Sequence, residues 1–321
     1  MAYKQLTKEE RAQKEDDYYK EVADFFIDAI KTNTAPWMKP CNGQDYLYPM
    51  NPVTGTVYSG MNSLRLGLIQ ELKYKSEDPR WLTFVNIREN GFMLEKGSRG
   101  VPVRFFYQVP LDSSGKIISP ADSGTREVAK YMPTHKTYIV FHSSGITGLP
   151  PLEKKEPLNK PVIIQNAEDI LLKSKALIFH DSHKNYYQPS TDEIHLVKRE
   201  NFKTPELYYC TALHELSHWT GASSRLDRNI KNTFGTEEYA KEELRAEIGS
   251  YMICKDLRLD FEPQNHIAYV QSWCKAIKDS PNEITKACYD ADKIKDFCVS
   301  FSQKQDKTNI LEDTHTSKKG R

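Results

Sequence analysis

Two histidines and a glutamate in the C-terminal half of the chain have the spacing of a metal site. In the segment His214-Glu215-Leu216-Ser217-His218, the histidines lie four residues apart. On a helix, that spacing brings both imidazoles to one face, where they can bind the same ion. Glu215 directly follows the first histidine, so its carboxylate can hydrogen-bond a water held by the ion and act as general base. The segment therefore predicts a metal-hydrolase site.

The surrounding sequence predicts the helix that this site needs. Thr204 and Pro205 are residue types preferred at the N-cap and the first helical position, and Gly221 is the expected glycine after the last turn. An apolar face that would bury the helix comes from Leu207, Cys210 and Leu213. The alternative is a helix with two satisfied surface histidines, and the start and stop signals argue against it.

A second helix, expected from about Thr236 to Leu257, offers a third ligand. Catalytic zinc sites normally have three protein ligands and one open position. Glu243 and Glu247 are four residues apart and lie along the edge of the apolar stripe of this helix. We expect Glu243 to bind the ion and Glu247 to accept a hydrogen bond from a ligand imidazole, with the reverse assignment open. Zinc is the expected ion, and Mn²⁺ or another divalent ion is the alternative.

Composition places limits on the class of protein. A chain of 321 residues has room for two domains, each with its own core. The net charge is +1, so a nucleic-acid surface would need local segregation of charge; residues 61–140 contain 12 Lys or Arg and 8 Asp or Glu. The six cysteines include no CxxC pair, which excludes a zinc ribbon and favours a reducing compartment. With no apolar signal core and no spanning stretch, the expected location is the cytoplasm, without membrane contact.

A Pro-rich, charged segment at residues 148–161 predicts a domain boundary. We expect a mixed α+β domain over residues 1–150, a second domain over 160–302 and a disordered polar tail over 303–321. The elements expected in the first domain are helices over 1–35 and 62–72, strands over 101–107 and 137–141, and an insertion loop over 110–132. Those expected in the second are a helix over 167–174, a hairpin over 186–196, and two helices within 264–301, besides the two helices described above.

Cations and aromatic side chains alternate between residues 80 and 107. Binding of single-stranded DNA needs cations for phosphates and aromatic faces for bases. Composition alone favours the other interpretation, in which the aromatic side chains fill a core and the cations are solvated. The loop from Lys96 to Gly100 leaves its side chains free to approach a phosphate. If this region binds DNA, the expected contacts are Lys96, Arg99, Arg104 and Trp81.

Several of these segments together resemble the ArdC-type antirestriction proteins. Residues Tyr208–Gly221 and Tyr239–Gly249 are similar to signatures of that family, as are Tyr58–Asn62 and Trp81–Phe84 in the N-terminal half. The resemblance covers nearly the whole chain except the extreme tail. It implies an α+β protein of two domains, an N-terminal single-stranded-DNA-binding domain and a C-terminal zincin-like metallopeptidase domain. Such proteins are encoded by plasmids, other mobile elements and phages.

The resemblance also implies a function: protection of incoming mobile-element DNA from restriction, as in plasmid conjugation. On this interpretation the protein binds single-stranded DNA and carries a zinc-dependent peptidase site, whose substrate would be a protein of the host defence. An edge segment near residues 187–196 could pair with an extended peptide. The alternative is a non-catalytic, DNA-coating protein with a structural or vestigial metal site. A metal-dependent nuclease is disfavoured, because that chemistry uses carboxylate-rich sites.

Overall fold

The computed structural model describes residues 7–43, 47–119, 127–153, 158–230, 232–233, 235–263 and 269–303. Contacts divide the chain into two compact units. The larger unit joins Met1–Tyr46 to Lys155–Arg321, and the smaller unit is Leu47–Lys154. Residues 304–321, which make up nearly all of the expected tail, lie outside the described part of the chain.

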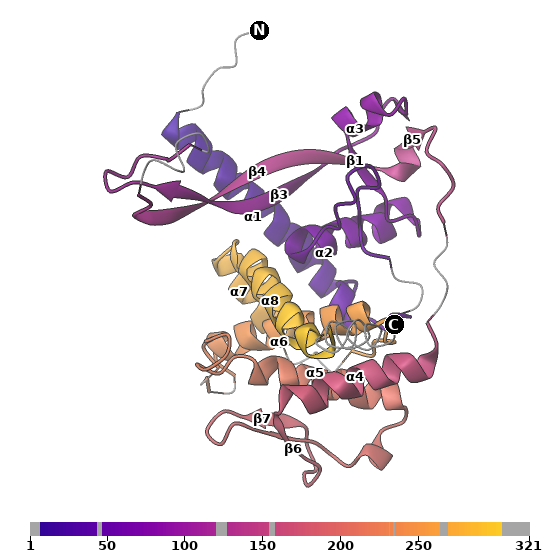
Figure 1. The fold of residues 1–321 in the computed structure, drawn as a ribbon, viewed down its shortest axis with the longest axis vertical. Helices are drawn as coiled ribbons and strands as arrows, with labels where there is room; N and C mark the ends of the chain where they lie inside the picture. Colours follow the sequence, from indigo (N-terminus) through magenta and orange to yellow (C-terminus); the bar gives the residue numbers. More distant parts are fainter. Residues whose placement is uncertain are drawn as a thin grey trace, which may run out of the picture. The chain divides into compact units, whose positions relative to one another are not determined.

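Helices build the larger unit (Figure 1). They are α1 (Lys8–Lys31), α4 (Lys160–Ser174), α5 (Pro205–Trp219), α6 (Glu237–Leu257), α7 (Val270–Asp279) and α8 (Glu283–Gln303), with short turns η1 (Pro36–Met38) and η5 (Arg199–Asn201). Helix α6 packs against α5, α7 and α8, and so lies at the centre of the unit. The helices expected around the histidines and around the glutamate pair are therefore both present and adjacent.

By its contacts, helix α1 groups with the larger compact unit, although the domain expected over residues 1–150 includes it. Its apolar stripe, which includes Val22, Phe26 and Ile30, is buried, and the helix packs against α7. The helix itself was expected from the spacing of these residues. Spacing alone shows that a helix has an apolar face but does not show what covers it, so the compact units differ from the expected domain bounds.

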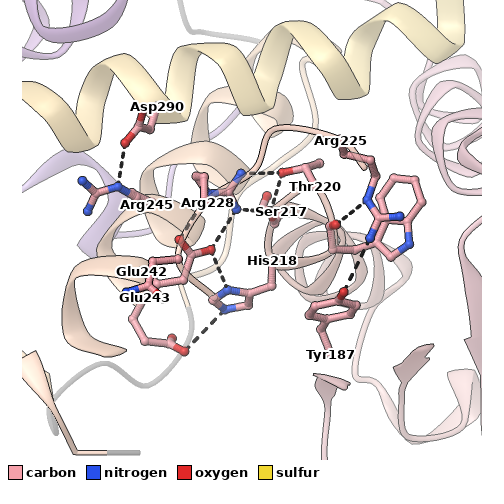
Figure 2. Close-up of polar contacts among 12 residues, drawn as sticks. Tyr187, Ser217, His218, Thr220, Arg225, Arg228, Glu242, Glu243, Arg245 and Asp290 are labelled. Atoms are coloured by element: carbon pink, nitrogen blue, oxygen red, sulfur yellow. Dashed lines mark hydrogen bonds and ion pairs between the residues drawn. The ribbon is translucent and has the colours of Figure 1, made fainter. Parts of the chain in front are cut away.

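Close packing and buried ion pairs hold α6 in place. A Cβ at Gly249 of α6 would lie 3.0 Å from Ile294 Cγ2 on α8, so the glycine allows the two helices to approach closely. Arg245 of α6 forms an ion pair with Asp290 of α8 at 2.7 Å (Figure 2). It forms a second one with Glu283, also on α8, at 2.8 Å. The helix that carries Glu243 and Glu247 is therefore rigidly placed.

A small sheet completes the larger unit. Its strands are β6 (Leu177–Phe179), β7 (Tyr186–Gln188) and β8 (Glu193–His195), in the order β6-β8-β7. Strand β7 pairs antiparallel with β8, with Tyr187 opposite Ile194, so the predicted hairpin is present and β7 is an edge strand. Arg225 forms an ion pair with Asp192 in the hairpin turn and stacks 3.8 Å from the centre of the Trp219 ring, which links the hairpin to the end of α5.

The smaller unit combines helices and antiparallel strands. It contains α2 (Gly60–Ile69), a π-helical turn (Gln70–Tyr74), β1 (Trp81–Thr83), α3 (Phe84–Glu89), β2 (Met93–Leu94), β3 (Val101–Leu111), β4 (Lys130–His142), a turn η4 (Ser143–Gly145) and β5 (Ile146–Thr147). The sheet has the order β1-β4-β3, and β2 pairs with β5. The predicted α+β class and the division into two domains are both confirmed.

Strands β3 and β4 form a long hairpin (Figure 1). Their register is continuous from Val101 opposite Val140 to Leu111 opposite Lys130. Both ends of the insertion loop expected over residues 110–132 are therefore strand, because the two strands continue to pair beyond their apolar segments. Residues 120–126 of that loop lie outside the described part of the chain. Among the described ranges, no helix is both long enough and apolar enough to cross a membrane.

Candidate metal site

Three donor groups from α5 and α6 come together as the sequence predicted. The Nε2 atoms of His214 and His218 lie 3.7 and 3.4 Å from the carboxylate oxygens of Glu243. One ligand atom from each of the three residues lies within 4.8 Å of the other two. Two imidazole nitrogens and one carboxylate oxygen are a donor set typical of zinc sites that keep one position open. The residues therefore fit a divalent ion.

Local sequence signals place the two histidines. Thr204 caps α5, accepting a hydrogen bond from the Leu207 amide at 3.2 Å, and Pro205 is the first helical residue, both as predicted. After the helix, a Cβ at Gly221 would lie 2.4 Å from Ile230 Cγ2. Glycine at this position therefore lets residues 222–230 fold back against the end of the helix.

This returning loop delivers Arg228 to a carboxylate that holds His218 (Figure 2). Glu242 Oε1 lies 3.3 Å from His218 Nδ1. Arg228 donates to both oxygens of Glu242, at 2.8 and 3.1 Å, and also to the Ser217 carbonyl at 2.7 Å and the Thr220 hydroxyl at 2.8 Å. An Nδ1–H that donates to Glu242 leaves Nε2 as the lone-pair donor on the side of Glu243.

Glu247 lies behind the other histidine. Its Oε2 is 4.0 Å from His214 Nδ1, on the side of the ring away from the Nε2 that faces Glu243. Each imidazole thus has Glu243 at Nε2 and a second carboxylate at Nδ1. This geometry favours Glu243 as the ligand. The hydrogen bond expected between Glu247 and a ligand imidazole is not formed, because 4.0 Å is too long for one.

The electrostatics of the cluster favour a bound cation. Burial lowers the pKa of His218, but Glu243 and Glu242 outweigh this effect and raise it well above the usual value. Burial raises the pKa of Glu243, while the charges of His218 and His214 and a hydrogen bond from Tyr239 lower it to about 2. Buried carboxylates of this kind are stable only when paired with positive charge, which a divalent ion can supply.

The site opens into a cavity of about 400 Å³. Glu215 lines this cavity, and its carboxylate accepts a hydrogen bond from the backbone N–H of Tyr187 in β7. Burial raises the pKa of Glu215, which suits a group that must take up and release a proton near neutral pH. Tyr186 and Tyr187 of β7, and Pro189 just after the strand, form part of the wall.

Four residues of the site were not predicted: Glu242, Arg228, Tyr239 and Tyr269. The Tyr239 hydroxyl hydrogen-bonds Glu243 and also contacts Tyr269, and both tyrosines line the cavity. Burial and the nearby Glu243 raise the pKa of Tyr239, so its hydroxyl stays protonated and can donate. The spacing offered one signal, because Tyr239 precedes Glu243 by four residues on the same helix.

The DNA contacts expected from the sequence lie in different environments. Trp81 is fully buried within the core of the smaller unit, so it presents no face on which a base could stack. Arg104 is 6% exposed, and its backbone N–H and carbonyl are both hydrogen-bonded to Asn62. The structure therefore does not support these two as DNA contacts. Lys96 and Arg99 are exposed in the loop before β3.

Comparison with protein families gives two matches that together span most of the chain. Residues 165–290 match the model of a zincin-like metallopeptidase family. Residues 16–141 match the model of the N-terminal domain of anti-restriction factor ArdC. The first range contains all of the candidate metal-site residues, and the second contains Lys96 and Arg99.

Related proteins and solved structures also match most of this chain. Two DNA primases TraC of Escherichia coli are 40% and 39% identical over 90% and 93% of this chain, although the chain spans only 27% and 21% of their length. The Sinorhizobium fredii protein y4eC is 29% identical over 91% of this chain and 94% of its own. Crystal structures of the antirestriction protein ArdC of plasmid R388, metal-free and Mn(II)-bound, superpose with TM-scores of 0.71 and 0.70 at 31% identity, covering 89% of this chain and 98% of theirs.

Proposed function

The chain belongs to the family of ArdC-type antirestriction proteins, and from this premise we propose that it binds single-stranded DNA and is a zinc-dependent peptidase. The observation that carries the peptidase part is the position of Glu215, which lies beside His214, His218 and Glu243 at the wall of an open cavity. The Mn(II)-bound ArdC structure supports a divalent ion in this family. Zinc is our specific proposal, because the donors are two imidazoles and one carboxylate.

A divalent ion bound by His214, His218 and Glu243 would polarise a peptide carbonyl and lower the pKa of a water molecule. The residues of the chain would do the rest. Glu215, held by the Tyr187 N–H, would take the proton of the attacking water and return it to the leaving amine. Glu242 would keep the His218 imidazole oriented, and the protonated Tyr239 hydroxyl, which donates to Glu243, would hold that carboxylate in place for the ion.

The edge strand β7 supports an extended peptide as substrate, because it lines the cavity and leaves one side unpaired by β8. Two features limit the backbone pairing that β7 and the residue after it, Pro189, can provide. The Tyr187 N–H is used by Glu215, and Pro189 has no N–H to donate. Pairing would therefore depend more on backbone carbonyl oxygens of this segment than on its amides. We propose an extended segment of a host-defence protein as the substrate class.

Metal removal tests the peptidase proposal. The full chain loaded with Zn²⁺ is expected to cleave peptides in a proteome-derived peptide library, with new termini read by mass spectrometry. Cleavage should cease after treatment with a chelator and return when Zn²⁺ or Mn²⁺ is restored. A chain that contains its ion and cleaves no peptide in the library would contradict this proposal and leave the DNA-coating alternative.

We propose that Lys96 and Arg99 approach the phosphates of single-stranded DNA in the cytoplasm of the host. Replacing both with alanine should reduce the dependence of oligonucleotide affinity on salt, because each lost phosphate contact lowers the slope of log K against log salt by about 0.7. Fluorescence anisotropy at several salt concentrations measures this slope. Lys198→Ala with Lys203→Ala, two exposed lysines of the larger unit, is the matched control. Equal slopes for both double variants would exclude Lys96 and Arg99.

A further inference from the structure

The smaller unit contains a groove of about 610 Å³, and none of the four DNA contacts expected from the sequence lines it. One wall is a face of the β3–β4 hairpin, and the other comes from residues 51–58 and 83–86. Register places Phe105 directly opposite Lys136, and Tyr138 opposite Val103 two residues away, so these side chains share one face. Tyr107, two residues after Phe105, lies on the same face.

Aromatic side chains dominate this face, and they are exposed. Phe105, Tyr107 and Tyr138 each expose more than a third of their surface. The Phe105 and Tyr138 rings meet edge to face at 5.5 Å, and Lys136 Nζ lies 5.6 Å from the centre of the Tyr107 ring. Exposed aromatic faces beside a cation are the elements with which proteins stack bases and hold the phosphates of single strands.

The opposite wall presents one amide in a fixed orientation. The Val53 N–H donates to Asn51 Oδ1 at 3.0 Å, so the other end of the Asn51 amide must be its NH₂. That NH₂ donates to Asn86 Oδ1 at 2.9 Å, and the Thr83 hydroxyl donates to the same oxygen at 2.7 Å. The Asn86 NH₂ is thereby set at the groove, and it has no acceptor among the residues that the structure describes.

Charge narrows the choice of ligand. Lys136 is a cation, and none of the described residues that line the groove is acidic. An aromatic groove alone would also suit a proline-rich peptide, but such a peptide gives no role to an unopposed lysine. A nucleotide uses all three features, because its base has flat faces and ring or carbonyl acceptors, and its phosphate is an anion.

We propose that this groove binds one unstacked base of single-stranded DNA. The base stacks against the aromatic side chains of β3 and β4, the Asn86 NH₂ donates to an acceptor on the base edge, and Lys136 contacts the adjoining phosphate. The proposal rests on the DNA binding proposed above and adds to it a site that senses the base as well as the backbone.

Two pairs of matched variants of the full chain test the stacking wall and the amide. Tyr138 and Tyr131 are both exposed on β4, but they are seven positions apart, an odd offset, so they point to opposite faces of the hairpin. In anisotropy titrations with a labelled oligothymidylate, Tyr138→Ala should weaken binding about tenfold, whereas Tyr131→Ala should bind as wild type does. Circular dichroism melting would verify that both variants fold.

Asn86→Asp retains the oxygen that accepts from Asn51 and Thr83 but replaces the donor NH₂ with a second oxygen. It should weaken oligothymidylate binding about tenfold, while Asn159→Asp, the same change at an exposed position of the larger unit, should not. On an abasic oligonucleotide, Tyr138→Ala should bind as wild type does, because no base remains to be stacked.

The outcomes separate this proposal from the one on which it rests. A wild-type chain without salt-sensitive affinity for any oligonucleotide would overturn both DNA binding and the groove. A wild-type chain that binds oligothymidylate, with all four variants equal to it, would overturn the groove alone. A loss caused by Tyr138→Ala that persists unchanged on the abasic strand would also overturn it.

Discussion

Glu215→Gln is expected to abolish peptide cleavage while the chain still binds its metal ion. Glutamine keeps the size of the side chain and can still hydrogen-bond a water, but it cannot take up a proton. General-base catalysis typically contributes about 10²- to 10⁴-fold to rate, so cleavage should fall by at least about a hundredfold. The metal content should not change, because Glu215 is not among the grouped donors His214, His218 and Glu243.

Peptide-library cleavage and elemental analysis of the same preparation measure both quantities. Glu238→Gln, at an exposed position of α6, is the matched control and should cleave as wild type does. Unchanged cleavage by Glu215→Gln would remove Glu215 from the chemistry. If the wild-type chain cleaves nothing and Glu215→Gln still protects DNA from restriction, the protein acts by coating DNA and its metal site is structural.

Glu243→Gln should reduce metal affinity more than Glu247→Gln does. Glu243 faces the Nε2 atoms of both histidines, whereas Glu247 lies at the Nδ1 side of His214 alone. Loss of an outer carboxylate typically costs about 10- to 100-fold in affinity. We therefore expect a loss within that range for Glu247→Gln and a larger loss for Glu243→Gln, because a charged ligand is removed.

Competition with a chromophoric chelator measures both affinities, with Glu238→Gln as the unaffected reference. The reverse order of the two losses would make Glu247 the ligand and Glu243 the outer carboxylate. Equal, small losses would show that neither carboxylate binds the ion.

The parts of the site that could be predicted depend on local sequence. The four-residue spacing of His214 and His218, the Thr204 cap and the Glu243–Glu247 pair follow from helix geometry, which sequence reports directly. Glu242 could not be separated from a solvated acidic face on α6. Its function depends on Arg228, and that residue reaches it only because the chain folds back after Gly221.

In the N-terminal half, local sequence could not show which side chains are buried and which are exposed. The alternation of cations and aromatic side chains predicted DNA contact for Trp81 and for exposed residues such as Lys96 alike. Trp81 is instead buried in the core. The aromatic groove uses Phe105 and Tyr107, which lie in the same run, together with Tyr138 and Asn86 from other elements. Which side of a strand faces solvent depends on pairing across the sheet, and pairing is not local information.

The most direct test of the account is a crystal structure of the full chain grown with Zn²⁺ and recorded at the zinc absorption edge. We predict one anomalous peak, marking a zinc ion bound by His214 Nε2, His218 Nε2 and a Glu243 carboxylate oxygen at about 2.0–2.2 Å. The Glu215 carboxylate should lie beside a fourth, open coordination position. The proposed metal site would be contradicted by an ion bound by Glu247 in place of Glu243, or by an ion bound by Glu215. It would also be contradicted if no peak lay between the two histidines.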